Sequence, residues 1–104
     1  ILGFTFKENC PDIRNTKVVD VYTELVDYNI EVDVYDPWAN KEEVSLTYGI
    51  NLLPDFNVEE YQGVVLAVSH KEFLSIDFAA FKKFNAVIFD TKAFINRSLV
   101  DARL

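Results

Sequence analysis

The sequence predicts an α/β domain: a Rossmann-like open parallel sheet of about five strands, with helices on both faces in a three-layer arrangement. Short apolar runs alternate with segments whose apolar residues follow helical spacing, which indicates repeated strand–helix–strand units. The runs are apolar throughout, as is typical of strands covered on both faces. The 104 residues are enough for one domain, 1–104, and too few for two.

A polar loop separates the first expected strand from the first helix. ILGFTF, at 1–6, is a continuous apolar run that predicts a buried strand. The helix is expected to start at Asn15 or Thr16, because either side chain can cap it. Its apolar positions keep helical spacing until Asn29, a residue that suits a left-handed stop.

The second helix is expected between the second and third strands. EVDVYD, at 31–36, is bounded by Pro37 and predicts a strand. Residues 39–48 predict a helix that stops at Gly49, and INLLP, at 50–54, is expected to hold a short strand.

The same alternation continues in the second half. YQGVVLAVS, at 61–69, is the clearest buried strand, and 70–84 predicts one or two helical segments, the second capped by Asp77. NAVIFDTK, at 85–92, predicts a fifth strand, and the last dozen residues a tail or a short helix. Right-handed crossovers then favour the strand order 3-2-1-4-5.

Composition argues against several classes of partner. A net charge of −7 argues against nucleic acid, and no apolar run is long enough to span a membrane. A single cysteine cannot form an internal disulfide, which fits a cytoplasmic location. The chain begins with Ile1 and contains no methionine, so we expect it to be a piece of a longer protein.

Basic side chains follow the ends of several expected strands. Lys7 follows the first strand, His70 the fourth and Lys92 the fifth, and Arg14 precedes the first helix. In an open parallel sheet, ligands bind beyond the C-terminal strand ends, so the topology brings these four residues to one edge. Fixed cations beside helix N-termini suit a phosphate group. A small anionic ligand is therefore one interpretation, and a chance grouping of loop cations is the other.

A dinucleotide site is an alternative use of this edge. Such a site requires G-x-G-x-x-G in the first turn, so that the backbone can approach the pyrophosphate, and residues 6–14 contain no glycine. Asp36 stands where a ribose-binding acid would, but an aspartate before Pro37 is more typical of a turn.

Cys10 is a candidate nucleophile close in sequence to Lys7 and Arg14. A catalytic thiol also needs an oriented base, and nothing in the sequence places His70 beside it. The alternative is a small residue packed in the turn before Pro11. One cysteine and one histidine cannot form a zinc site, so no metal is expected.

The motifs of this chain resemble those of one family. FKENCPDIRNTKVVDVYTELVDYNIEVDVYDPW, at 6–38, is similar to the start of the C-terminal UDP-binding domain of the UDP-glucose/GDP-mannose dehydrogenase family, and F-K-x-x-x-x-D-x-R is its most specific part. EEVSLTYGI, VVLAVSHKEF, IFDTK and the terminal DARL extend the likeness over nearly the whole chain. The chain looks most like the branch that oxidises UDP-N-acetylhexosamines, the N-acetyl-D-galactosamine or N-acetylglucosamine 6-dehydrogenases of bacterial surface-polysaccharide and capsule synthesis.

The resemblance implies one part of a longer oxidoreductase. In the family, an N-terminal domain binds NAD, a central helical region forms a homodimer or larger assembly, and the C-terminal domain binds the UDP-sugar. The sugar C6 alcohol becomes a carboxylate in two hydride transfers to NAD, through a cysteine in an upstream motif. Cys10 does not match that motif, so the resemblance implies no catalytic residue in this chain.

Four positions match family residues. Phe6 and Lys7 match the F-K pair that contacts the UDP-sugar. Arg14 matches the arginine that reaches the NAD held by the N-terminal domain. Lys92 stands where relatives place a basic residue, often as Gly-Arg, against the UDP-sugar; this chain has Thr91-Lys92, and a lysine lacks the bidentate fork of arginine.

Two other functions stay open. A non-catalytic interaction or regulatory domain of Rossmann-like fold would bind a protein through the acidic surface of residues 18–60. An independent hydrolase based on Cys10 would be active without any further domain.

Overall fold

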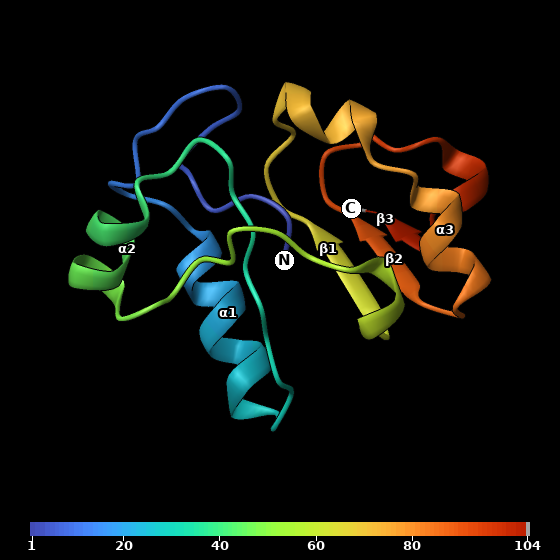
Figure 1. The fold of residues 1–104 in the computed structure, drawn as a ribbon, viewed down its shortest axis with the longest axis horizontal. Coiled ribbons are helices and arrows are strands. Elements are labelled where there is room, and N and C mark those ends of the chain that lie inside the picture. Colours follow the sequence, from blue (N-terminus) through green and yellow to red (C-terminus); the bar gives the residue numbers. More distant parts are fainter. Residues whose placement is uncertain (104) are drawn as a thin grey trace.

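The computed structural model describes residues 1–103, and Leu104, the last residue of the DARL sequence, lies outside it. Figure 1 shows short helices on either side of a small sheet. In chain order the elements are α1 (Val18–Asp27), α2 (Lys41–Tyr48), η1 (Val58–Glu60), β1 (Gly63–Leu66), η2 (Lys71–Ser75), α3 (Phe78–Lys83), β2 (Val87–Asp90), η3 (Arg97–Leu99) and β3 (Ala102–Arg103).

The sheet is parallel and has the order β1–β2–β3. Val64 of β1 pairs with Ile88 of β2, and Phe89 pairs with Ala102 of β3. Because strand side chains alternate between faces, Val64, Leu66 and Ile88 point to one side, where Phe78 and Phe81 of α3 pack against them. The α/β class with a parallel sheet is confirmed.

The expectation of about five strands is wrong, since the described residues form a sheet of three. Residues 1–6 and 31–36 run beside the sheet, but single bridges join Leu2 to Tyr35 and Leu2 to Leu66. Gly3 interrupts the extended backbone with a φ of +94°. Beyond it, the Asp36 carboxylate, in place of a backbone carbonyl, accepts the next two N–H groups. The ladder therefore stops after one bridge.

The lateral order of these segments nevertheless agrees with the expected order 3-2-1-4-5. In the expected third strand, the Leu53 N–H donates to the Val34 carbonyl at 2.8 Å. Tyr35 lies beside Leu2, Leu2 beside β1, and β1 beside β2. In the last dozen residues, the expected short helix is η3. β3 follows it as an additional strand, because the Asp101 N–H and side chain both bond to Ile88.

The expected helix stops and caps are mostly confirmed. Asn29 and Gly49 have φ values of +61° and +69°, and the Asp77 side chain accepts the Ala80 N–H at the start of α3. α1 begins later than expected, at Val18, whose N–H donates to the Thr16 hydroxyl. α1 and α2 cover a second core cluster, made of Phe4, Ile13, Val18, Val34, Ala39, Val44, Ile50, Leu52 and Val68. Within residues 1–103, no helix is both long and apolar enough to cross a membrane.

Candidate functional site

The loop at 6–14 carries three of the predicted site residues. The Phe6 N–H donates to the Asp12 carbonyl at 2.8 Å and closes the base of the loop. Phe6 is 56% exposed, and Lys7 is exposed beside it. The Arg14 guanidinium grips the Asp12 carboxylate through Nε and Nη2, each at 3.0 Å, and its side chain is 83% exposed. This hydrogen bonding holds the pKa of Asp12 below its usual value.

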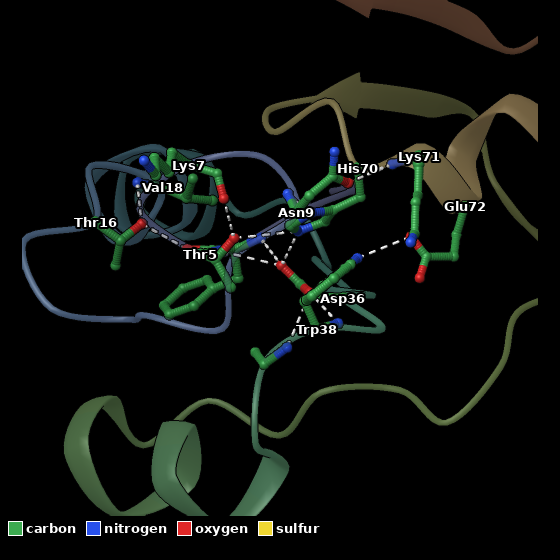
Figure 2. Close-up of polar contacts among 12 residues, drawn as sticks. Thr5, Lys7, Asn9, Thr16, Val18, Asp36, Trp38, His70, Lys71 and Glu72 are labelled. Carbon is green, nitrogen blue, oxygen red and sulfur yellow. Dashed lines mark hydrogen bonds and ion pairs between the residues drawn. The ribbon is translucent and has the colours of Figure 1, made fainter.

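A buried carboxylate lies beneath the loop (Figure 2). Oδ2 of Asp36 accepts the backbone N–H groups of Phe4 and Thr5 at 2.6 and 3.0 Å. Oδ1 accepts those of Trp38 and Ala39 at 2.7 and 3.1 Å. Burial raises the pKa of Asp36, but hydrogen bonds from His70 and from the backbone outweigh it, so the pKa lies below its ordinary value of 3.8. The interpretation of Asp36 as a turn residue is confirmed. Because its side chain is buried, a ribose cannot reach it.

His70 is fully buried and joins this carboxylate to the loop. Its Nε2 lies 2.9 Å from Asp36 Oδ2 and 3.1 Å from the Thr5 hydroxyl, and its Nδ1 accepts the Asn9 N–H at 3.0 Å. Because Nδ1 is an acceptor, the ring proton resides on Nε2. Both ring nitrogens are engaged, so His70 is neither a cation for a ligand nor a free base for Cys10.

The outer side of His70 is covered by an aromatic and charged layer. The Trp38 ring stacks on the imidazole, with centroids 6.0 Å apart. Lys71 Nζ lies 5.4 Å from the Trp38 centroid, and the indole N–H donates to Glu72 at 2.8 Å. This layer excludes water from the Asp36–His70 pair.

A second buried carboxylate shapes the loop that carries Lys92. Asp90, at the end of β2, accepts the N–H groups of Lys92, Phe94 and Ile95 at 2.9, 2.7 and 2.7 Å. The Thr91 hydroxyl donates to the Leu66 carbonyl at 2.8 Å and ties this loop to the end of β1. The Lys92 side chain is left exposed.

The predicted residues thus divide into two groups. Lys7, Arg14 and Lys92 are exposed on the loops at 6–14 and 91–95, whereas His70 is buried and bonds to the backbone of the first loop. Sequence patterns do not predict the Asp36–His70 pair. The available signal is an acid that ends an apolar run and a lone histidine that ends another.

The residues present do not fit a dinucleotide. The loop at 6–14 lacks glycine, and Gly3 is needed for packing, since a Cβ there would lie 2.6 Å from the Val68 Cβ. Within residues 1–103, no three His, Cys, Asp or Glu side chains gather as metal ligands would. The site can therefore attract an anion through exposed lysine and arginine side chains. The buried His70 and Asp90 side chains hold the backbone of the loops that carry them.

Comparison with known proteins agrees with this geometry. Residues 1–97 match the UDP-binding domain of the UDP-glucose/GDP-mannose dehydrogenase family. A UDP-N-acetyl-D-glucosamine 6-dehydrogenase from Pseudomonas aeruginosa is 43% identical over 107 residues, which cover 100% of this chain and 25% of that protein. The chain therefore spans about a quarter of the length of such relatives.

Solved structures show the same fold. The UDP-N-acetyl-mannosamine dehydrogenase Cap5O of Staphylococcus aureus matches 98% of this chain and 24% of its own, with 30% identity and a TM-score of 0.70. A UDP-D-ManNAc dehydrogenase from Pyrococcus horikoshii matches 98% of this chain and 23% of its own, with 23% identity and a TM-score of 0.71.

Proposed function

The chain belongs to the UDP-glucose/GDP-mannose dehydrogenase family, as its UDP-binding domain, and we propose that it binds the UDP-sugar within an NAD-dependent nucleotide-sugar 6-dehydrogenase. The proposed substrate is a UDP-N-acetylhexosamine, because the relatives of this chain include enzymes named for UDP-N-acetylhexosamines. Its C6 alcohol is oxidised to the uronic acid for surface-polysaccharide synthesis in the cytoplasm. The NAD domain and the catalytic cysteine belong to the remainder of the full-length protein.

Exposed lysines on fixed backbone support the UDP-binding role. Lys7 follows the segment on one side of β1, and Lys92 follows β2 on the other side of β1. Both loops therefore leave the same sheet edge, where parallel α/β sheets bind ligands. A diphosphate there would meet positive charge without any glycine-rich turn. Phe6, which is 56% exposed next to Lys7, offers an apolar contact to the same ligand.

Arg14 is proposed to face the NAD held by the N-terminal domain. Asp12 occupies only its Nε and one Nη2 hydrogen, so the remaining guanidinium N–H groups are available to a phosphate. Because Asp12 also accepts the Arg14 backbone N–H at 2.9 Å, the pairing holds the arginine in a fixed direction. The arginine can therefore contact the neighbouring domain without breaking its ion pair with Asp12.

Binding of the diphosphate, although it is far from the C6 atom of the sugar, assists catalysis by positioning the substrate. Energy gained at the diphosphate holds the alcohol against the reacting groups of the other domain. NAD, when bound there, accepts the hydride in each of the two oxidation steps. The residues of this chain bind and orient the substrate and take no part in bond making.

The experiment uses the full-length protein and follows NADH formation with UDP-N-acetylglucosamine, UDP-N-acetylgalactosamine and UDP-glucose. We expect NADH to form with an N-acetylhexosamine substrate, and Lys7→Ala to raise its KM by about tenfold to a hundredfold, the value of a lost charge-assisted hydrogen bond. Lys83→Ala, which removes an exposed lysine on α3, is the matched control and should leave KM unchanged.

Two results would contradict this proposal. If no UDP-sugar yields NADH and UDP does not bind, the dehydrogenase role fails and a protein-interaction domain becomes the better account. If Lys7→Ala and Lys83→Ala behave alike, the UDP-sugar lies elsewhere on the domain.

A further inference from the structure

We infer that His70 is a positioning residue for UDP binding: the buried imidazole fixes the backbone of residues 7–9 so that Lys7 is presented to the ligand. This inference rests on the proposed function and adds a role for a side chain that cannot itself touch UDP. His70 has no exposed surface, so it can act only through the groups it bonds.

The imidazole holds the loop at two points, drawn in Figure 2. Nδ1 accepts the Asn9 N–H directly, at 3.0 Å. On the other side of the ring, Nε2 lies 3.1 Å from the Thr5 hydroxyl, which donates to the Lys7 carbonyl at 2.9 Å. The two bonds fix the backbone on both sides of Glu8, and therefore fix where the Lys7 side chain starts.

The loop needs this support because it has no regular secondary structure to hold it. Asn9 has a φ of +54°, in the left-handed region, which asparagine adopts more readily than other non-glycine residues. The Asn9 side chain accepts the Lys71 N–H at 2.8 Å, so a second bond joins the same residue to the start of η2. Without these bonds the loop has other conformations of similar energy, and Lys7 loses its fixed position.

The directions of the hydrogen bonds form one consistent chain. The neutral ring carries its one proton on Nε2, which shares it between Asp36 Oδ2 at 2.9 Å and the Thr5 hydroxyl oxygen at 3.1 Å, because the hydroxyl donates its own proton to the Lys7 carbonyl. This tautomer is required for Nδ1 to accept the Asn9 N–H. Phe73 and Trp38 pack against the ring edge and face, so an apolar residue could fill the space but could not direct the loop.

The experiment measures steady-state kinetics and UDP inhibition of the full-length enzyme. Thr5→Val keeps the shape of a fully buried side chain and removes the bond to Lys7, whereas Thr5→Ser keeps that bond. We expect Thr5→Val to raise the KM for the UDP-sugar and the inhibition constant of UDP by about tenfold, with kcat and the KM for NAD within about twofold of wild type. Thr5→Ser should behave as wild type.

Variants of His70 test the two sides of the ring. His70→Asn offers an oxygen near the place of Nδ1 and should retain part of the UDP affinity, whereas His70→Leu loses both bonds and should match or exceed the effect of Thr5→Val. Ile88→Val, a buried change in the core cluster of β2 and α3, controls for stability alone and is compared by thermal unfolding.

Four outcomes decide the inference. A selective rise in the UDP constants of Thr5→Val and His70→Leu supports it. Constants within about twofold of wild type overturn it, as does an equal rise in Ile88→Val, since loss of stability would then be sufficient. A wild-type enzyme that binds no UDP overturns both this inference and the proposed function, whereas normal binding with insensitive variants overturns this inference alone.

Discussion

Replacing Asp36 by asparagine should destabilise the domain strongly, although the two side chains have nearly the same shape. In the native structure each carboxylate oxygen accepts two backbone N–H groups, and Oδ2 also meets His70 Nε2. Asparagine turns one of these acceptors into an N–H₂ donor. The less damaging orientation places the N–H₂ group at the position of Oδ1, which has two donors rather than three. The N–H groups of Trp38 and Ala39 then lose their acceptor and face another donor.

The size of the effect follows from that count. A buried donor without a partner costs about 1–3 kcal/mol, so two of them cost about 2–6 kcal/mol. Small domains have about 5–15 kcal/mol of total stability, so Asp36→Asn should bring this one near its folding threshold.

Urea unfolding followed by circular dichroism measures this loss. Asp27→Asn, which changes an exposed acid at the end of α1, is the control and should change the free energy of unfolding by less than about 0.5 kcal/mol. A loss in Asp36→Asn as small as that of the control would refute the view that this carboxylate holds the strand ends together.

Three further predictions concern the loss of stability in acid, the substitution of two glycines and the role of the Cys10 thiol. Because the pKa of Asp36 is lowered on folding, its contribution to stability is complete above its ordinary value of 3.8 and disappears as pH falls through the lower folded value. Urea midpoints should therefore fall in acid more steeply for wild type than for Asp36→Asn, and parallel curves would contradict this. Gly3→Ala should cost about 2–5 kcal/mol, since its φ is +94° and a Cβ would lie 2.6 Å from Val68 Cβ; Gly49→Ala, with φ +69° and open space, should cost about 1–2 kcal/mol in the same urea assay. Cys10→Ser should leave UDP binding and full-length activity unchanged in calorimetric and NADH assays, and a loss of NADH formation with UDP binding intact would contradict the view that Cys10 takes no part in catalysis.

The strand-and-helix alternation was predictable because apolar runs and turn residues act locally. Asn29, Gly49 and Asp77 stop or cap helices where the sequence predicts it, since each acts through its own backbone or a neighbour a few residues away. The number of strands was not predictable. The kink at Gly3 depends on close approach to Val68, a contact between residues far apart in the chain.

The candidate site shows the same division. Lys7 and Lys92 follow expected strand ends and Arg14 precedes the first helix, so a simple topology rule predicts all three at one edge. The Asp36–His70 pair joins residues 34 positions apart. It forms only if residues 31–36 and the segment after β1 end at the same level along the sheet. No local pattern carries that information, so the sequence alone predicts His70 to be another basic residue of the loops.

The central claim is that UDP binds at the strand ends through Lys7 and Lys92, and an NMR titration of the chain with UDP tests it most directly. We predict amide shift changes confined to the loops at 6–14, 70–71 and 91–95, weakened by Lys7→Ala. An absence of shifts at millimolar UDP, or shifts gathered at the opposite edge around Gly63 and Val87, would contradict the claim.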